Sequence, residues 1–197
     1  MFVKICGITT LPAAEAAVAA GADALGFVFA PSAREITPER AAALCAGLPR
    51  TVTRVAVLRH PAASHWRRVL EVFAPDWVQT DAADLQDIEL PAGCTALPVY
   101  RNGSVPAAGE PLPTRLLFEG AVSGSGRPAD WDEARRVAAR TELMLAGGLD
   151  AYNVADAIRR VRPWGVDVSS GVEQRRGEKD PAKIKDFVAR VRALEEQ

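Results

Sequence analysis

The chain has 197 residues, enough for one sizeable hydrophobic core and too few for two ordinary domains, so we expect a single domain over residues 1–197. It carries 24 Lys and Arg residues against 25 Asp and Glu residues, and the net charge of -1 gives no sign of nucleic acid or an anionic membrane as a partner. No apolar stretch approaches the ~20 residues that cross a bilayer, and the first residues read as a strand rather than a targeting segment. The three cysteines are odd in number and widely spaced, which favours free thiols and a cytoplasmic location.

Eight short apolar runs alternate with amphipathic stretches along the chain. Most of the runs are almost continuously hydrophobic, which is typical of parallel strands covered on both faces. The expected strands are residues 2–6, 23–29, 52–58, 76–79, 95–99, 115–119, 142–146 and 164–168.

Helical periodicity fills six of the segments between and after these runs. Apolar residues recur at i, i+3, i+4 and i+7 in residues 41–48, 66–73, 154–161 and 184–191, and the stretches after Thr10 and Asp130 are further helix candidates. Residues 82–88 leave room for two turns at most, and residues 103–113 contain three prolines and read as a loop. The pattern predicts an α/β fold, a single (β/α)8 TIM barrel whose fourth and fifth helices are short or degenerate. A doubly wound open sheet is the alternative.

Two turns at the ends of the seventh and eighth strands are rich in glycine and serine. One contains Gly147 and Gly148, and the other contains Ser169, Ser170 and Gly171. Either turn alone could be an ordinary tight turn. Together they lie where (β/α)8 barrels often bind phosphate, so we predict a phosphate site there.

Side chains at the ends of other strands are candidates for chemistry. Cys6 ends the first strand and shares its parity with Lys4, so both should point into the barrel, with Lys4 able to influence the thiol. Glu119 ends the sixth strand and could act as a general acid, or be a solvated charge at the rim. Asp167 could orient a substrate or cap a turn, and Arg34 could bind an anionic or aromatic group, although most arginines in loops are solvated.

Other polar residues receive structural interpretations. His60 and His65 are five residues apart and do not share a helix face, so we predict no metal site. Cys45 lies on the apolar stripe of a helix and Cys94 precedes a strand without other reactive residues nearby, so both are expected to be structural.

These residues resemble the motifs of the phosphoribosylanthranilate isomerase family, and the resemblance runs over essentially the whole chain. The first and last motifs, at their distances from the ends of the chain, are highly specific. The matching segments are residues 3–9 (VKICGIT), residues 21–29 (GADALGFVF) with Pro31 and Arg34, residues 147–149 (GGL), and residues 166–173 (VDVSSGVE) with Gly177, Lys179 and Asp180.

The resemblance implies an Amadori rearrangement of N-(5'-phosphoribosyl)anthranilate in tryptophan biosynthesis, without a metal or organic cofactor. It places the general base on Cys6 and the general acid on Glu119. Arg34 and Asp167 fall on positions that contact the anthranilate part, and the two Gly/Ser turns fall on the phosphate site. The family contains monomers and homodimers, so either state is possible.

Two positions depart from the family's pattern. Glu119 stands where the family has an aspartate, and its extra methylene changes the position of the carboxyl group. Asp81 stands where the family usually has a histidine. A non-catalytic barrel that binds sugar phosphates is therefore an alternative. A metal-dependent epimerase is a more distant one, because the two histidines lie in the wrong places.

Overall fold

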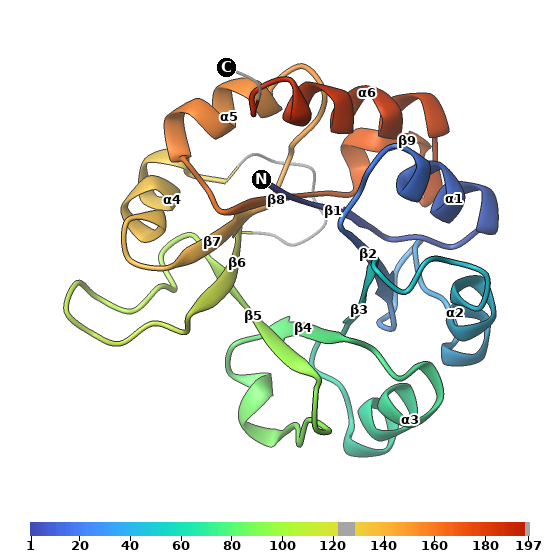
Figure 1. Ribbon diagram of the computed structural model, residues 1–197. Coiled ribbons are helices and arrows are strands. Elements are labelled where there is room, and N and C mark those ends of the chain that lie inside the picture. Colours follow the sequence, from blue (N-terminus) through green and yellow to red (C-terminus); the bar gives the residue numbers. More distant parts are fainter. Residues whose placement is uncertain (122–128, 196–197) are drawn as a thin grey trace.

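A computed structural model describes residues 1–121 and 129–195, and its centre is a closed barrel of parallel strands (Figure 1). Each strand pairs with the next one along the chain, and β8 pairs with β1 to close the barrel. The predicted barrel is therefore confirmed, and the alternative open sheet is wrong. The strands are β1 (Phe2–Cys6), β2 (Ala24–Val28), β3 (Thr53–Val57), β4 (Trp77–Asp81), β5 (Thr95–Arg101), β6 (Arg115–Glu119), β7 (Glu142–Leu145) and β8 (Gly165–Val168).

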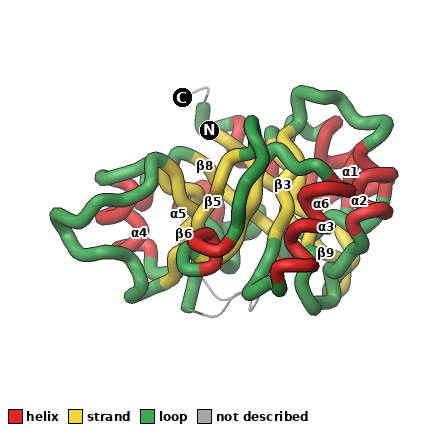
Figure 2. Tube along the Cα trace, turned by 90° about the horizontal axis from the view of Figure 1, so that it is seen from below, coloured by secondary structure: helices red, strands yellow, loops and turns green. Residues whose placement is uncertain are grey.

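In the described part of the chain, six α-helices surround the strands, as the periodicity predicts. They are α1 (Leu11–Ala19), α2 (Pro38–Cys45), α3 (Ala63–Phe73), α4 (Trp131–Ala138), α5 (Val154–Val161) and α6 (Pro181–Arg192). Side-chain oxygens of Thr37, Asp130 and Asp180 accept hydrogen bonds from backbone N–H groups at the starts of α2, α4 and α6. Figure 2 shows the strands at the centre of the molecule and the N-terminus on its upper side. None of the described helices is both long enough and apolar enough to cross a membrane.

The two segments with weak helical periodicity, residues 82–88 and 103–113, also form no α-helix in the structure. After β4 the chain makes only a short 3-10 helix, η1 (Asp84–Asp87). Between β5 and β6 it forms an outer loop in place of a helix (Figure 1). Arg140, just after α4, donates to the backbone oxygens of Pro106, Ala107 and Glu110 and so ties this loop to the barrel.

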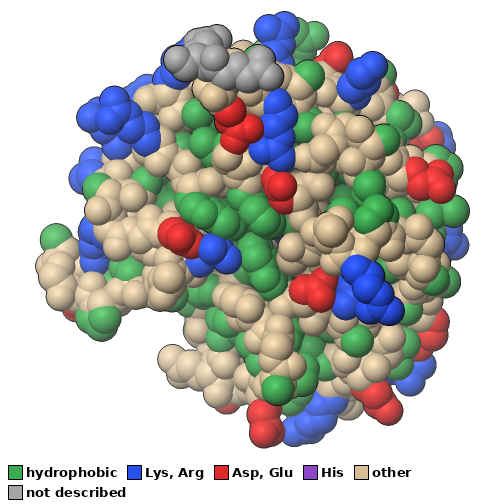
Figure 3. Space-filling model, in the orientation of Figure 1, with side chains coloured by type: hydrophobic (Ala, Val, Ile, Leu, Met, Phe, Trp, Pro, Cys, Tyr) green, Lys and Arg blue, Asp and Glu red, His purple; other side chains and the backbone are tan. Residues whose placement is uncertain are grey.

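Hydrophobic side chains fill both the shell between helices and strands and the interior of the barrel. The interior cluster comprises Leu97, Val99, Leu117, Met144 and Ala146. At the amino ends of the strands, the Phe2 ring stacks on Trp77 and on Trp164, with centroids 5.2 and 4.6 Å away. Figure 3 views this end, where hydrophobic side chains gather over the centre of the barrel. The packed amino end leaves the carboxyl ends of the strands as the open side.

A small hairpin after β8 is fixed to the loop after β2 by buried charges. The hairpin consists of β9 (Glu173–Arg175) and β10 (Glu178–Lys179). The Glu173 carboxylate accepts two hydrogen bonds from Arg34, over 2.7 and 3.0 Å, and one from Lys179 over 2.8 Å. At Gly177, a Cβ atom would lie 2.3 Å from the backbone oxygen of Ala33, so glycine permits this close contact. The network therefore holds the loop after β2 together with β9 and β10, beside the open end of the barrel.

Acid should weaken this network through Glu173. Burial raises the pKa of Glu173, but hydrogen bonds from Arg34 and Lys179 outweigh that effect and bring the pKa from 4.5 to about 2. Because the pKa of Glu173 is lower in the folded protein than in the unfolded chain, its ionised carboxylate stabilises the folded state above pH 4.5. This stabilisation is lost as the pH falls from 4.5 towards 2. A shift of this size corresponds to roughly 3 kcal/mol at neutral pH.

We expect Glu173→Gln to lower the free energy of unfolding at pH 7 by roughly that amount, about 3 kcal/mol, in urea titrations. The difference from the unmodified chain should shrink as the pH falls towards 3. Asp156→Asn, which changes an exposed carboxylate on α5, is the control and should leave the midpoint unchanged. An equal difference at pH 7 and pH 3 would contradict this account.

Candidate active site

A cavity of about 260 Å³ opens at the carboxyl ends of the strands, where a (β/α)8 barrel is expected to hold its active site. Eight of the nine site residues predicted from the sequence come together around it, although they are spread from residue 6 to residue 170. Its lining includes Cys6, Arg34, Glu119, Gly147, Gly148, Asp167, Ser169 and Ser170. Gly171 does not line this cavity.

Cys6 lies at the inner end of the cavity and is 7% exposed. Its strand neighbour in the register is Gly26, where a Cβ atom would lie only 2.9 Å from the Cys6 sulfur. A residue with a side chain at position 26 would therefore displace the thiol. Burial raises the pKa of Cys6 above its ordinary value, although the positive charges of Lys4 and Lys179 act in the opposite direction. The resting group is thus a thiol with two ammonium groups nearby that favour its ionised form.

Beneath Cys6, Lys4 and Asp167 form an ion pair inside the barrel. The distance from Lys4 Nζ to Asp167 Oδ1 is 2.7 Å, and the lysine side chain is fully buried. Burial lowers the pKa of Lys4, but the negative charge of Asp167 and its hydrogen bond act in the opposite direction, and the pKa lies above its ordinary value. Lys4 therefore stays an ammonium group, and Asp167 is anchored through one oxygen while its side chain also lines the cavity.

Glu119 reaches the cavity from the end of β6 and meets a residue that the sequence analysis missed. Arg101 Nη2 lies 3.0 Å from Glu119 Oε1 and 2.6 Å from Asp81 Oδ1. The alternation of β5 could have indicated Arg101, because it follows the inward-facing Leu97 and Val99 at spacings of two. The guanidinium group at the end of β5 thus joins two carboxylates at the ends of the strands on either side, β4 and β6.

Arg34 lines the cavity, but its guanidinium group is already engaged by Glu173 through Nε and Nη2. Gly7 makes room for it, because a Cβ atom there would lie 2.5 Å from Arg34 Cδ. The interpretation of Arg34 as a solvated loop residue is therefore wrong. The arginine is a fixed part of the wall, with Glu173 as a partner that the sequence alone did not reveal.

The two predicted phosphate turns lie against each other. Gly147 and Gly148 both have positive φ angles, of 92° and 64°, which glycine adopts readily. Ser169 Oγ donates to the backbone oxygen of Cys6 over 3.1 Å. At Gly171 a Cβ atom would lie 2.0 Å from the backbone oxygen of Leu149, so this glycine permits the contact between the turns rather than lining the cavity.

Gln79, on β4, presents a buried acceptor at the cavity. The residue is 7% exposed, and among the described residues its Oε1 atom has no hydrogen-bond partner. A buried polar atom without a partner costs free energy, and a donor on a bound molecule would remove that cost. Gln79 is therefore a further candidate for ligand binding.

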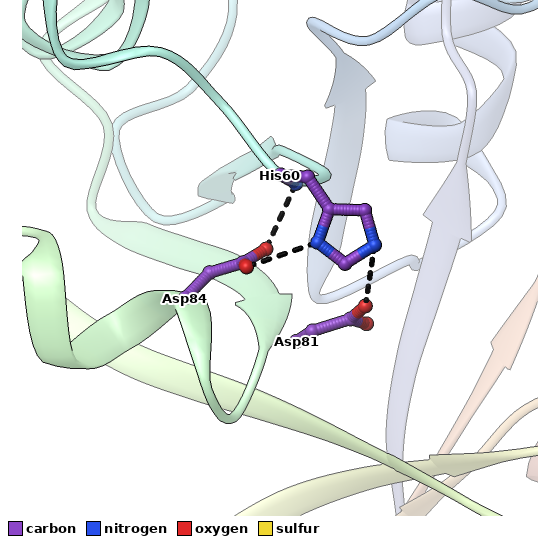
Figure 4. Close-up of side chains that lie close together, drawn as sticks. All are labelled: His60, Asp81 and Asp84. Carbon is purple, nitrogen blue, oxygen red and sulfur yellow. Dashed lines mark hydrogen bonds and ion pairs between the residues drawn. The ribbon is translucent and has the colours of Figure 1, made fainter.

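A histidine and two aspartates meet at the rim (Figure 4), and the sequence analysis did not foresee this cluster. His60 Nδ1 lies 3.0 Å from Asp84 Oδ1, and His60 Nε2 lies 3.4 Å from Asp81 Oδ2. His65 points elsewhere and donates to the backbone oxygen of Phe29. The donor atoms of the cluster lie within 4.8 Å of one another, as metal ligands could. However, a cation there would share Asp81 with the guanidinium group of Arg101, which disfavours binding.

Comparison with known proteins places the chain in one family. A sequence model described as N-(5'phosphoribosyl)anthranilate (PRA) isomerase matches residues 3–190. The N-(5'-phosphoribosyl)anthranilate isomerase of Streptococcus pneumoniae serotype 19F (strain G54) is 42% identical over 193 residues, which cover 96% of this chain and 95% of the relative.

Solved structures agree. The phosphoribosyl anthranilate isomerase of Thermus thermophilus is 32% identical, with a TM-score of 0.82 over 98% of this chain and 100% of that one. A phosphoribosyl anthranilate isomerase in complex with reduced 1-(o-carboxyphenylamino)-1-deoxyribulose 5-phosphate is 31% identical, with a TM-score of 0.80 over the same shares. Because the family model matches residues 3–190 and a relative is 42% identical over 96% of the chain, the chain belongs to the N-(5'-phosphoribosyl)anthranilate isomerase family.

Proposed function

We propose that this barrel catalyses the isomerase reaction of its family, the Amadori rearrangement of N-(5'-phosphoribosyl)anthranilate, with Cys6 as the general base and Glu119 as the general acid. One observation carries the assignment of roles: a thiol on β1 and a carboxyl group on β6 line the same cavity as the two Gly/Ser turns. A phosphosugar held by those turns would lie between the two groups, and positioning of this kind makes a large contribution to catalysis.

The reaction begins with two proton transfers, one to the ring oxygen of the ribose and one from its C2 atom. The Glu119 carboxyl group gives its proton to the ring oxygen of the ribose, the bond between that oxygen and C1 breaks, and a Schiff base forms. The Cys6 thiolate then removes the proton from C2, and the electron pair of that bond moves to give an enolamine. Tautomerisation of the enolamine gives the 1-deoxyribulose product.

Buried charges near Cys6 support its role as the base. The thiol must lose its proton to act, and its burial opposes this step. Lys4 and Lys179 favour the thiolate, and both are held in place by carboxylates, Lys4 by Asp167 and Lys179 by Glu173. The ammonium groups therefore stabilise the charge that develops on sulfur without having to move.

The remaining cavity residues bind the substrate in this proposal. Gly147, Gly148, Ser169 and Ser170 hold the phosphate through their turns, and Gly171 keeps the turns in contact. Asp167 and Arg34 contact the anthranilate part. Gln79 accepts a hydrogen bond from the substrate, which satisfies its buried oxygen.

Removal of the Cys6 thiol tests the general base. Cys6→Ala should lower kcat by at least about 10²-fold, since a positioned base contributes about 10²–10⁴-fold. The measurement is the loss of anthranilate-type fluorescence from phosphoribosylanthranilate. Cys45→Ala, on the outer helix α2, is the control and should keep its activity. Full activity of the Cys6 variant would overturn the assignment of the base.

Glu119→Gln tests the general acid, because the amide keeps the shape of the side chain but has no acidic proton. We expect kcat to fall by about 10²–10⁴-fold while a product analogue still binds. Glu119→Asp, which restores the residue typical of the family, should remain active. If the unmodified chain binds the analogue but does not turn over substrate, and Glu119→Asp does not restore turnover, the chain is a non-catalytic sugar-phosphate binder instead.

Gly171→Ala tests the phosphate site. Its Cβ atom would lie 2.0 Å from the Leu149 oxygen and would push the two turns apart. We expect KM to rise by about tenfold, with a smaller change in kcat, because binding at a remote group is lost. Gly47→Ala is the control, since a Cβ atom there meets nothing within 4 Å. An unchanged KM for the Gly171 variant would argue against a phosphate at these turns.

A further inference from the structure

The two positions at which the chain departs from its family's pattern contact the same side chain. Glu119 and Asp81 lie at the ends of β6 and β4, and Arg101 ends the strand between them. Arg101 is the direct register partner of Glu119 across β5 and β6. Its Nη2 atom lies 3.0 Å from Glu119 Oε1 and 2.6 Å from Asp81 Oδ1. The two departures are therefore physically connected.

The three side chains are shielded enough for their charges to interact strongly. Exposed fractions are 23% for Arg101, 16% for Asp81 and 13% for Glu119. Partly buried pairs of this kind are screened less than exposed ion pairs, most of which contribute little. Burial disfavours the charged form of Arg101, yet the hydrogen bond with Asp81 and the charge of Glu119 raise its pKa above the ordinary value. The guanidinium charge therefore persists at the rim of the cavity.

The backbone around Arg101 is also fixed. The Arg101 N–H donates to Ser104 Oγ over 2.7 Å, and Ser104 Oγ donates back to the Arg101 carbonyl over 2.9 Å. The Gly103 N–H in the same turn donates to both carboxylate oxygens of Glu133 on α4, over 3.0 and 3.1 Å. Arg101 therefore projects from an anchored turn.

A guanidinium group next to a general acid has two opposing effects. It fixes the carboxyl group in space, which favours catalysis, but it also attracts the ionised form, which has no proton to give. A second carboxylate on the same guanidinium group reduces the second effect, because it shares the positive charge. Asp81 is that second carboxylate, and at 2.6 Å it lies closer to Arg101 than Glu119 does.

We propose that Arg101 is a positioning residue that holds the Glu119 carboxyl group towards the substrate, and that Asp81 neutralises Arg101 so that Glu119 can keep its proton. The proposal rests on the role of Glu119 in the proposed function. Among the described residues, His60 and Asp84 also face this unit: His60 Nε2 lies 3.4 Å from Asp81 Oδ2, and Asp84 binds the other nitrogen of His60 (Figure 4). A protonated His60 would compete with Arg101 for Asp81.

The direct test follows the ionisation of Glu119 by NMR in protein labelled with ¹³C at the glutamate carboxyl group, with the signal assigned by its loss in Glu119→Gln. In Asp81→Asn the full charge of Arg101 acts on Glu119, so the titration midpoint should move to lower pH by about one unit, a tenfold smaller protonated fraction. In Arg101→Met the midpoint should move to higher pH. Opposite directions are required, and midpoints that stay unchanged or move the same way would overturn the proposal.

Kinetics supply the second readout. Asp81→Asn should lower kcat at pH 7 by about tenfold, in proportion to the smaller protonated fraction of Glu119, and kcat should recover as the pH falls. Arg101→Met should lower kcat by about 10²-fold even where Glu119 is protonated, because the contact that orients the carboxyl group from β5 is lost. Arg101→Lys keeps the positive charge but not the planar guanidinium group. The titration midpoint of Glu119 should therefore stay close to that of the unmodified chain, while kcat should still fall. If Arg101→Met fails to fold, the lysine variant and Asp81→Asn still decide the question.

A matched control and a separate check keep the two proposals distinguishable. Arg54→Met removes an arginine that binds Asp76 at the other end of the barrel, and it should change neither the Glu119 midpoint nor kcat. Should Glu119→Gln keep full activity, the assigned acid is wrong and the proposed function needs revision. Should Glu119→Gln lose activity while Asp81→Asn and Arg101→Met behave like the unmodified chain, only the inference about Arg101 fails.

Discussion

An ion pair in the interior joins the first strand of the barrel to the last. Lys4 and Asp167 are register partners in the β1–β8 pairing that closes the sheet, and their side chains meet over 2.7 Å. A fully buried lysine is costly unless it is paired, so the position of Asp167 is effectively required once Lys4 points inward. The next inward residue on β1 is Cys6, so the same alternation that buries Lys4 puts the thiol at the inner end of the cavity.

Several charged side chains around this cavity are held in small groups of opposite charge. Lys4 binds Asp167, Arg34 and Lys179 share Glu173, and Arg101 bridges Asp81 and Glu119. The pairing suits a chain whose net charge is -1, because the local groups and not a global potential must recognise an anionic ligand. It also keeps the cationic groups rigid, which matters for stabilising a charge that forms only during reaction.

Much of the fold could be predicted from the sequence because parallel strands covered on both faces leave a simple signal. The predicted ranges 2–6 and 115–119 agree with β1 and β6 to the residue, and the weak helical signal at residues 82–88 and 103–113 corresponds to η1 and to the outer loop. The ends of strands also identified most of the residues that line the cavity, since a barrel gathers those ends at one side.

The partners of those residues could not be predicted in the same way. Glu173 lies 139 residues from Arg34, and no spacing rule connects them. His60 contacts Asp81 and Asp84 from a loop in which its φ angle is positive, at 45°. The sequence pattern does not predict this conformation at a histidine. Pattern analysis therefore finds which side chains reach the cavity, whereas the charges that tune them depend on loop geometry and on register between strands.

Register also changes how a substitution at a strand end should be judged. Neighbouring strands of a sheet lie about 4.8 Å apart, so a long side chain at the end of β5 can reach side chains at the ends of both β4 and β6. Glu119 in place of aspartate looks like an isolated change of length when only its own strand is considered. Together with Arg101 and Asp81 it is one part of a three-strand unit, in which the longer side chain extends to a guanidinium group that a second carboxylate already holds. In the proposed function, the consequence of the extra methylene therefore depends on the neighbouring strands as well, because Arg101 contacts the Glu119 carboxyl group and Asp81 contacts Arg101.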